Sequence, residues 1–371
     1  MSERASSERT VRVPAVDRPL LTAQVLLGAL GMVGVAAGAS EPTSPVGHGL
    51  RVLAAIGVTL LVSRLSVKAV LKLSPIVFVV SLALLVAVLF VGISPAGSES
   101  KRWLDLGVFT LQPSEFMKVA VIAYLAAFFY NHLGDWHIWR PMLVIGLAVA
   151  TVVAEPDLST GLFIFTLAFT VMIAAGTTIT RLFSITLAAA AIATLLAAPY
   201  LSQFSYLKDR VIGYADLWGA REQADTTSYQ ALQAQEAVAR GGITGIGPGR
   251  SAQVPEADTD FISVAIGQSL GLLGLATLVA VYLLIARRGL RIGSAVDGPA
   301  SLLAAGATAY ICGQAGLNLL VASGLAPVTG IPLPGVSHGF NSLLSVAIAF
   351  GFLHIAARTA HKQAGPEATA A

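Results

Sequence analysis

The stretch SPIVFVVSLALLVAVLFVGISP, residues 74–95, runs for 22 residues without one ionisable side chain. A helix of about 20 apolar residues is long enough to cross the hydrocarbon core of a bilayer, which is about 30 Å thick. Similar apolar windows recur along the whole chain. We place them near residues 20–39, 46–63, 74–95, 113–130, 139–155, 158–175, 180–200, 261–286, 299–322 and 342–358. The sequence therefore predicts an all-α polytopic membrane protein with about ten transmembrane helices.

The bulk composition excludes an ordinary soluble protein. Hydrophobic residues make up 55% of the 371 residues and charged residues only 12%, with a mean hydropathy of +0.77. Soluble proteins carry about 25% charged residues. The net charge of +3 is not gathered on a basic face with interleaved aromatic residues, so we expect no nucleic-acid partner. The single cysteine, Cys312, lies in an apolar run, which excludes a disulfide framework and a thiolate metal site.

The placement of positive charge predicts how the spans face. With ten spans, both ends of the chain lie on one side, and positive residues concentrate in cytoplasmic segments. The segments on that side hold Arg4, Arg9, Arg12, Arg18, Arg64, Lys68, Lys72, Arg140, Arg181, Arg287, Arg288, Arg291, Arg358 and Lys362, whereas the short segments on the other side hold only Arg51, Lys101, Arg102 and Lys118. We therefore expect a cytoplasmic tail over 1–19, one membrane domain over 20–358 and a second cytoplasmic tail over 359–371. The polar stretch 201–260 would be a long extracytoplasmic loop between spans seven and eight.

Residues 64–72, Arg-Leu-Ser-Val-Lys-Ala-Val-Leu-Lys, form an amphipathic pattern between the second and third windows. A segment of this kind, with cationic residues on one face, is typical of a helix that lies in the membrane interface. A solvated linker is the alternative reading of the same residues.

A first cluster of polar residues surrounds the start of the fourth window, in residues 100–107 and 111–118. Proline suits the first turn of a helix, so Pro113 predicts a helix start. Glu115 and Lys118 are three residues apart, which places them on one helix face as an ion pair. The alternative is an ordinary helix end, with Ser114 as a cap and Lys118 extending toward the interface.

Two further acidic clusters precede spans six and eight. Asp157, in the run Glu155-Pro-Asp-Leu-Ser-Thr160, is placed to cap the helix of span six. Asp260, at the end of the long polar stretch, could also serve as a cap. However, three carboxylates within five positions, those of Glu256, Asp258 and Asp260, exceed what capping requires. Ionisable groups at span ends avoid lipid, so we expect these side chains to point into the protein or a water-filled cavity.

Glycine and proline mark two more candidate segments. Tyr229-Gln230 and the glycine-rich run 241–249 lie in the long polar stretch, where successive glycine amides form either an anion-binding nest or a flexible outer loop. Asn318 and the helix breakers of 324–342 predict a structured, non-helical loop packed in protein. His338 in this loop either titrates near neutral pH or is a hydrogen-bonded structural residue.

Taken together, these clusters resemble the motifs of the SEDS family of bacterial cell-wall proteins, the group of RodA, FtsW and SpoVE. The family's Arg-Trp pair and its Gln-Pro-Ser-Glu-x-x-Lys run are matched by Arg102-Trp103 and by residues 112–118. Its remaining motifs are matched in order by residues 156–160, Tyr229-Gln230 with 241–249, residues 255–262, and Asn318 with 324–337. The resemblance covers roughly residues 20–360.

The chain departs from the family's pattern at several positions. Family members usually have Gln where this chain has Glu155, Gly where it has Ser159, and Glu where it has Gln268. Their Ser-Tyr-Gly-Gly-Ser-Ser run reads Ser-His-Gly-Phe-Asn-Ser at residues 337–342. These differences are those of a divergent paralogue, and they bear on its substrate contacts.

The resemblance implies a peptidoglycan glycosyltransferase of the bacterial cytoplasmic membrane that polymerises lipid II at the outer face. Asp260 would be the catalytic base, and Lys118, Arg102 and Arg210 would bind the departing diphosphate. Trp103, Ser337 and Ser342 would complete the substrate site. Glu115 and Asp157 would hold the cationic side chains or share in binding a divalent cation, Mg²⁺ or Mn²⁺. A class B penicillin-binding protein is the implied partner.

Two other classes of function remain open from the sequence. A lipid II flippase would also have polar span ends, although alternating access favours polar groups near the bilayer midplane. A non-catalytic scaffold for a class B penicillin-binding protein is the other. The sequence does not separate a role in elongation from one in division or sporulation.

Overall fold

The structure is a computed structural model, and it describes residues 16–38, 44–94, 101–107, 109–131, 138–197, 226–249, 254 and 257–363. Two predicted site residues, Arg210 and Glu256, lie outside this part of the chain. The described elements are α1 (Arg18–Gly38), α2 (Pro45–Ser63), α3 (Val67–Val91), β1 (Leu104–Asp105), β2 (Thr110–Leu111), α4 (Pro113–Asn131), α5 (Trp139–Ala154), α6 (Leu158–Ala174), α7 (Ile179–Ala197), α9 (Thr226–Gly241), α10 (Ile262–Ser294), α11 (Pro299–Thr308), the π-helix η2 (Ala309–Gly313), α12 (Gln314–Ala322) and α13 (Phe340–Gln363).

The predicted all-helical membrane architecture is confirmed. Within the described residues, seven helical stretches are long and apolar enough to cross a membrane: α1, α2, α3, α4, α10, α13 and the continuous run α11–η2–α12. Three shorter apolar helices, over Trp139–Ala154, Leu158–Ala174 and Ile179–Ala188, fall in the remaining predicted windows. These apolar segments form helices because a helix satisfies its own backbone hydrogen bonds where no water is available.

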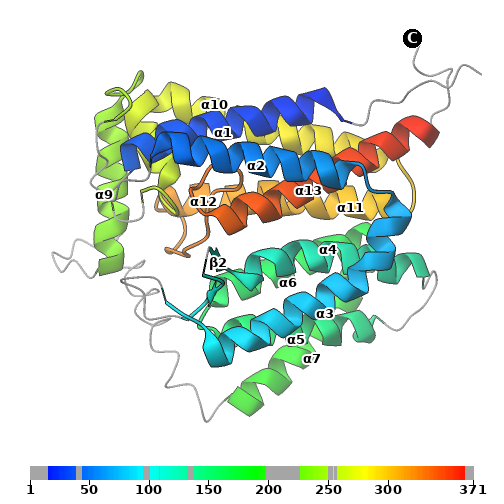
Figure 1. Cartoon of the computed structure of the whole chain (residues 1–371). Coiled ribbons are helices and arrows are strands. Elements are labelled where there is room, and N and C mark those ends of the chain that lie inside the picture. Colours follow the sequence, from blue (N-terminus) through cyan, green and yellow to red (C-terminus); the bar gives the residue numbers. More distant parts are fainter. Residues whose placement is uncertain are drawn as a thin grey trace, which may run out of the picture.

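The helices form two groups that lie against each other (Figure 1). One group contains α1, α2, α10, α11 and α13, in which α1 packs on α10 and α2 packs on α13. In the other, α4 contacts α3, α5 and α6, and it also reaches α11 and α13 of the first group. The α4 and α13 helices are therefore mostly buried, whereas α2 and α3 present most of their surface outward. The polar residues of the first turns of α4, Ser114, Glu115 and Lys118, accordingly lie inside the protein rather than in lipid.

Two stretches contain helix that the apolar windows did not include. Residues 67–72 are the first turns of α3, which begins at Val67 and continues to Val91 with Pro75 inside it. The Ser66 hydroxyl caps this helix by accepting from the amide of Ala69 at 3.1 Å. Within the polar stretch 201–260, α9 occupies Thr226–Gly241 and packs against α10.

The glycine-rich run 241–249 is not a flexible loop, because it docks on a kink in α10. Gly271 breaks that helix with φ +66°, and a Cβ atom at this position would lie 2.4 Å from the carbonyl oxygen of Ile243. The amides of Ile246 and Gly247 donate to the carbonyl oxygens of Gln268 and Ser269 at 3.0 and 3.1 Å. These two amides are consequently committed to the fold and do not contribute to an anion-binding nest.

Candidate functional site

A non-helical loop, residues 323–339, connects α12 to α13 and packs into the protein as expected. Ile331, Leu333 and Val336 are buried in the hydrophobic core. The Tyr282 hydroxyl of α10 donates to the carbonyl oxygen of Pro334 at 2.7 Å. Short apolar side chains therefore anchor the loop, while its backbone finds hydrogen-bond partners on neighbouring helices.

This loop is joined directly to the turn that carries Asp260. The buried Ser337 hydroxyl donates to the carbonyl oxygen of Thr259 at 2.7 Å and accepts from the amide of Leu333 at the same distance. The amide of His338 donates to the carbonyl oxygen of Asp258 at 3.0 Å. The loop and the turn thus form one hydrogen-bonded unit at the start of α10.

Asp260 is half-buried at this junction. The amide group of Asn318, on α12, donates to the carbonyl oxygens of Asp260 and Ile331 at 2.7 and 2.9 Å. A Cβ atom on Gly330 would lie 3.5 Å from Asp260 Oδ2, so loop backbone borders the carboxylate. The cap position of α10 belongs to Phe261 and has no side-chain cap hydrogen bond.

The predicted ion pair between Glu115 and Lys118 is present, with 2.6 Å between Nζ and Oε1. Both side chains are almost fully buried, with exposed fractions of 2% and 1%. Lys118 therefore does not extend to the interface, and the helix-end interpretation was wrong for it. It was also wrong for Ser114, whose buried hydroxyl makes no hydrogen bond within the described residues.

The buried pair is linked to the loop through residues that the sequence did not single out. Gln314 accepts from Lys118 Nζ at 2.8 Å and donates to the carbonyl oxygen of Pro332 at 2.8 Å. Glu115 Oε2 accepts from the hydroxyls of Tyr310 and Ser345 at 3.2 and 3.1 Å. One polar network consequently runs from the core of α4 to the loop beside Asp260. Gln314 and Tyr310 could have been identified from the sequence, because polar residues within an apolar span usually face the protein interior.

Arg102, Trp103 and Asp157 form a second group. Arg102 lies 3.5 Å from Asp157 Oδ2 and donates to the carbonyl oxygens of Glu155 and Pro156 at 3.3 and 2.6 Å. The predicted helix cap is confirmed, since Asp157 Oδ1 accepts from the amide of Thr160 at 3.1 Å. Trp103, partly exposed, is held by a β-bridge to Ile93. The arginine is the partly exposed member of its ion pair, with 18% of its side chain exposed against 5% for Asp157.

Glu155 is the unexpected member of this second group. Its side chain is only 2% exposed, and neither carboxylate oxygen has a hydrogen-bond partner among the described residues. Burial and then the charge of the nearby Asp157 together raise the pKa of Glu155 to about 8, against the lowering effect of Arg102. A protonated carboxyl group offers an O–H donor and a carbonyl acceptor, and the amide of the Gln that the SEDS pattern usually has here likewise offers both a donor group and a carbonyl acceptor. Having Glu155 in place of this Gln therefore changes the hydrogen-bonding groups at the position less than the charge of an ionised glutamate would suggest.

His338 is a structural residue rather than one that titrates near neutral pH. Its ring nitrogen Nε2 and its carbonyl oxygen both accept from Arg51, the latter at 3.3 Å. Burial and then the charge of Arg51 lower the pKa of His338 to about 4. The ring of the buried His48 lies beside it, with centroids 5.7 Å apart. The contacts of Arg51 and His48 with His338 were not predicted from the sequence, because residue spacing does not show that α2 packs against the loop.

The remaining predicted positions are dispersed. Ser342 is buried on the first turn of α13, and its hydroxyl makes no hydrogen bond within the described residues. Gln268 is buried at the kink of α10. Tyr229 and Gln230 lie on α9, and their side chains are outside the described ones.

The residues proposed for a divalent cation do not fit one. Both oxygens of Glu115 accept from Lys118, Tyr310 or Ser345. The carboxylate of Asp157 is occupied by the Thr160 amide and by Arg102. Among the described residues there is no group of three His, Cys, Asp or Glu side chains arranged to hold a metal ion.

The sequence and the fold both match known proteins. A family model described as "Cell cycle protein", covering FtsW, RodA and SpoVE, matches residues 27–362. The chain is 30% identical to the probable peptidoglycan glycosyltransferase FtsW of Hahella chejuensis, over 94% of this chain and 91% of that protein. It is 32% identical to the stage V sporulation protein E of Bacillus subtilis, over 76% of this chain and 77% of that protein.

Two solved structures share the architecture. One is a chain from a peptidoglycan synthase complex described as coordinating polymerization and crosslinking, with 25% identity, a TM-score of 0.77, and coverage of 94% of this chain and 99% of that one. The other is the rod shape determining protein RodA of Thermus thermophilus, with 23% identity, a TM-score of 0.63, and coverage of 93% and 97%. The chain is therefore a member of the FtsW/RodA/SpoVE family of membrane proteins.

Proposed function

We propose that this chain is a peptidoglycan glycosyltransferase that polymerises lipid II, with Asp260 as the catalytic base. Support comes from its relatives, among them a probable peptidoglycan glycosyltransferase at 30% identity over most of both chains. The observation that carries the proposal is the position of Asp260. Its carboxylate is half-buried, and its turn is held from two sides by the buried side chains of Ser337 and Asn318.

The reaction requires a base and a site for the leaving group. The 4-hydroxyl oxygen of one lipid-linked sugar attacks the anomeric carbon of another, and the bond from that carbon to undecaprenyl diphosphate breaks. Asp260 takes the hydroxyl proton as the new glycosidic bond forms, while the electron pair leaves with the diphosphate. A carboxylate fixed by its surroundings suits this role, because general bases act through position first and pKa second.

We assign the two cationic groups different tasks. Arg102 is partly exposed beside Asp157, so it is available to a diphosphate at the protein surface. Lys118 is buried and its charge is compensated by Glu115, so we assign it a positioning role. It acts through Gln314, which holds the backbone of Pro332 in the loop beside Asp260.

The orientation and the partner are part of the same proposal. The distribution of Lys and Arg supports cytoplasmic termini in the bacterial inner membrane, which places Asp260 at the outer face. The similarity to one chain of a peptidoglycan synthase complex supports a partner enzyme that crosslinks the glycan, a class B penicillin-binding protein.

The direct test is polymerisation of lipid II by the purified full-length protein, alone and with its partner, in wild-type form and as Asp260→Ala. Asp297→Asn is the matched control, because Asp297 is an exposed acid outside the candidate site. The proposal expects glycan chains from the wild type and the control and none from Asp260→Ala. Labelled lipid II that crosses vesicle membranes without being polymerised would instead indicate a flippase. Inactivity of the wild type with its partner present would indicate a scaffold.

A further inference from the structure

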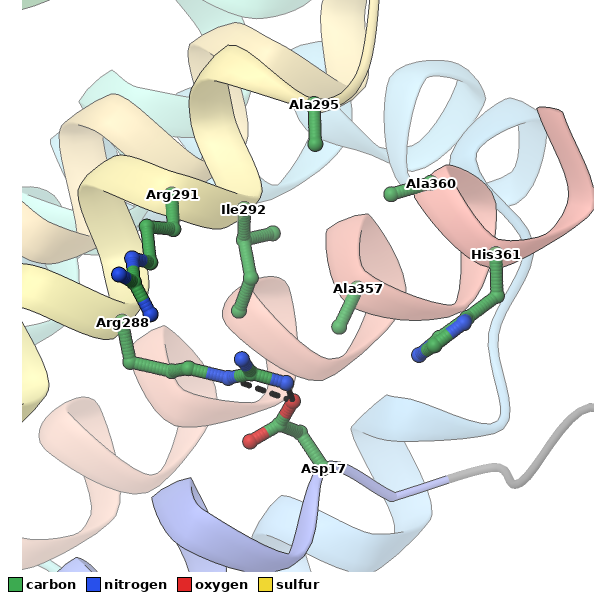
Figure 2. A pocket seen from close by; sticks show the side chains of 8 residues that line it. All are labelled: Asp17, Arg288, Arg291, Ile292, Ala295, Ala357, Ala360 and His361. Carbon is green, nitrogen blue, oxygen red and sulfur yellow. Dashed lines mark hydrogen bonds and ion pairs between the residues drawn. The ribbon is translucent and has the colours of Figure 1, made fainter. Parts of the chain in front are cut away.

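A pocket of about 280 Å³ lies at the opposite end of the helices from the loop, between the last turns of α10 and α13 and the start of α1 (Figure 2). Figure 2 shows Arg288 and Arg291 on α10 facing His361 on α13 across small and apolar side chains. A second pocket of about 240 Å³ shares Asp17, Arg288 and His361 with the first and adds Arg18 and Arg358. Neither pocket touches the residues assigned above to lipid II.

The shared wall of these pockets is rigidly held. Asp17 is buried, and its amide donates to the Nδ1 atom of His354 at 3.0 Å. Its carboxylate caps α1 by accepting from the amide of Leu20 at 3.2 Å. The same carboxylate accepts two hydrogen bonds from Arg288, at 2.6 and 3.0 Å. The pocket is therefore formed by the fold and does not depend on a ligand to order it.

Positive charge exceeds negative charge in this region. Four arginines line the two pockets, against the single carboxylate of Asp17, which is already paired with Arg288. Arg18 and Arg291 are exposed, and neither has a hydrogen-bond or ion-pair partner for its guanidinium among the described residues. Planar guanidinium groups with free donors are the side chains best suited to phosphate oxygens.

The depth of the pocket points to a lipid headgroup. Arg288 lies 17 residues after the kink at Gly271, or about 26 Å along the helix that follows it, which is close to the hydrocarbon thickness of about 30 Å. Leu283 and Leu290, on the same helix, are 64% and 66% exposed, which suits contact with acyl chains. Basic pockets between helices at this level of a membrane bind anionic phospholipid headgroups.

We infer that the end of the bundle formed by α1, α10 and α13 binds the phosphate of an anionic phospholipid across the two adjoining pockets, with Arg291 of the first and Arg18 of the second as its principal contacts. The acyl chains would run along the exposed leucines of α10. The orientation proposed above puts this site in the inner leaflet, but the chemistry of the site does not depend on that orientation.

Native mass spectrometry of the detergent-solubilised full-length protein tests this inference, with phosphatidylglycerol, phosphatidylcholine and inorganic phosphate as probes. The wild type should retain phosphatidylglycerol in preference to phosphatidylcholine, and equimolar inorganic phosphate should not displace it. Arg18→Gln combined with Arg291→Gln should weaken binding about 25-fold, from about fivefold for each arginine near a lipid surface. Arg287→Gln is the matched control, because it removes an exposed arginine of the same helix that does not line the pocket.

Three results would overturn the inference. The first is an equal loss of binding in Arg287→Gln, which would mean that only local charge density matters. The second is unchanged binding in the double variant whose unfolding midpoint matches the wild type. The third is displacement of the lipid by inorganic phosphate, which would mean that the ligand is a soluble anion. Because the readout is lipid binding, its failure is distinguishable from a failure of lipid II polymerisation.

Discussion

The hydroxyl of Ser337 donates a 2.7 Å hydrogen bond to the carbonyl oxygen of Thr259, the residue before Asp260. The same hydroxyl accepts from the amide of Leu333, so one buried side chain joins two segments that are about 75 residues apart. A carboxylate at a helix start can move with its turn. This contact fixes the turn, and with it the direction of the proposed base.

Ser337→Ala should therefore reduce activity without removing any group that touches the substrate. The change leaves a buried amide without its acceptor, which costs about 1–3 kcal/mol. A small displacement of Asp260 should lower the rate of lipid II polymerisation by between about tenfold and a hundredfold. Ser323→Ala is the control, because the Ser323 hydroxyl is exposed and bonds only within its own helix end. Equal rates for the two variants would exclude a positioning role for Ser337.

Lys118→Met should destabilise the protein strongly. It leaves the buried carboxylate of Glu115 without its counter-charge, which typically costs about 3–5 kcal/mol. The double variant Glu115→Gln/Lys118→Met should recover most of that loss, because no unpaired charge remains. The unfolding midpoint in detergent measures both effects, with the exposed Lys68→Met as control. A double variant no more stable than Lys118→Met would contradict the importance of the pair.

Glu155 should make stability depend on pH. Because burial raises its pKa to about 8, the folded protein binds a proton at Glu155 that the unfolded chain releases near its ordinary value of 4.5. The favourable contribution is complete below pH 4.5 and is lost progressively as the pH rises through 8. Glu155→Gln should remove this slope and be the more stable protein at pH 9.

Unfolding midpoints of the wild type and Glu155→Gln between pH 5 and 9 provide the measurement. The difference in favour of the variant should grow with pH. Parallel curves would contradict the raised pKa. The exposed Asp297→Asn serves as control for the loss of a surface carboxylate.

Gly271→Ala should disrupt the docking of the glycine-rich run on α10. Its positive φ is strained for any L side chain, and the added Cβ would meet the carbonyl oxygen of Ile243 and the amide of Gly245 at 2.4 and 2.5 Å. A lower unfolding midpoint is expected. Gly57→Ala, at a helical glycine with open space around it, should leave the midpoint unchanged or raise it. Equal effects of the two substitutions would mean that the kink is not required.

The helices were predictable because each depends on a continuous local property, the apolar character of about 20 residues. The same holds for the Glu115–Lys118 pair and the Asp157 cap, since both join residues three apart in one helix. Helix α9 was missed because its sequence is polar and carries no apolar window. Residues 67–72 fell outside the third apolar window because Lys68 and Lys72 interrupt the apolar run, although α3 runs through them.

The hydrogen-bond network around Asp260 could not be predicted from local sequence. Gln314 joins Lys118 to Pro332 only because α12 and α4 meet in the folded protein. Likewise, the amides of Ile246 and Gly247 find their hydrogen-bond acceptors only because residues 241–249 contact α10 in the folded protein. Spacing along the chain determines which residues share a helix face, but it does not determine which other helix that face meets.

The central claim is that Asp260 takes the proton from the attacking hydroxyl. The most direct measurement is the initial rate of lipid II polymerisation by Asp260→Asn, compared with the wild type and with Asp297→Asn, at equal amounts of folded protein in the membrane. If Asp260 is the base, Asp260→Asn should lose activity by at least about a hundredfold and the control should lose none. Polymerisation by Asp260→Asn at the wild-type rate would contradict it.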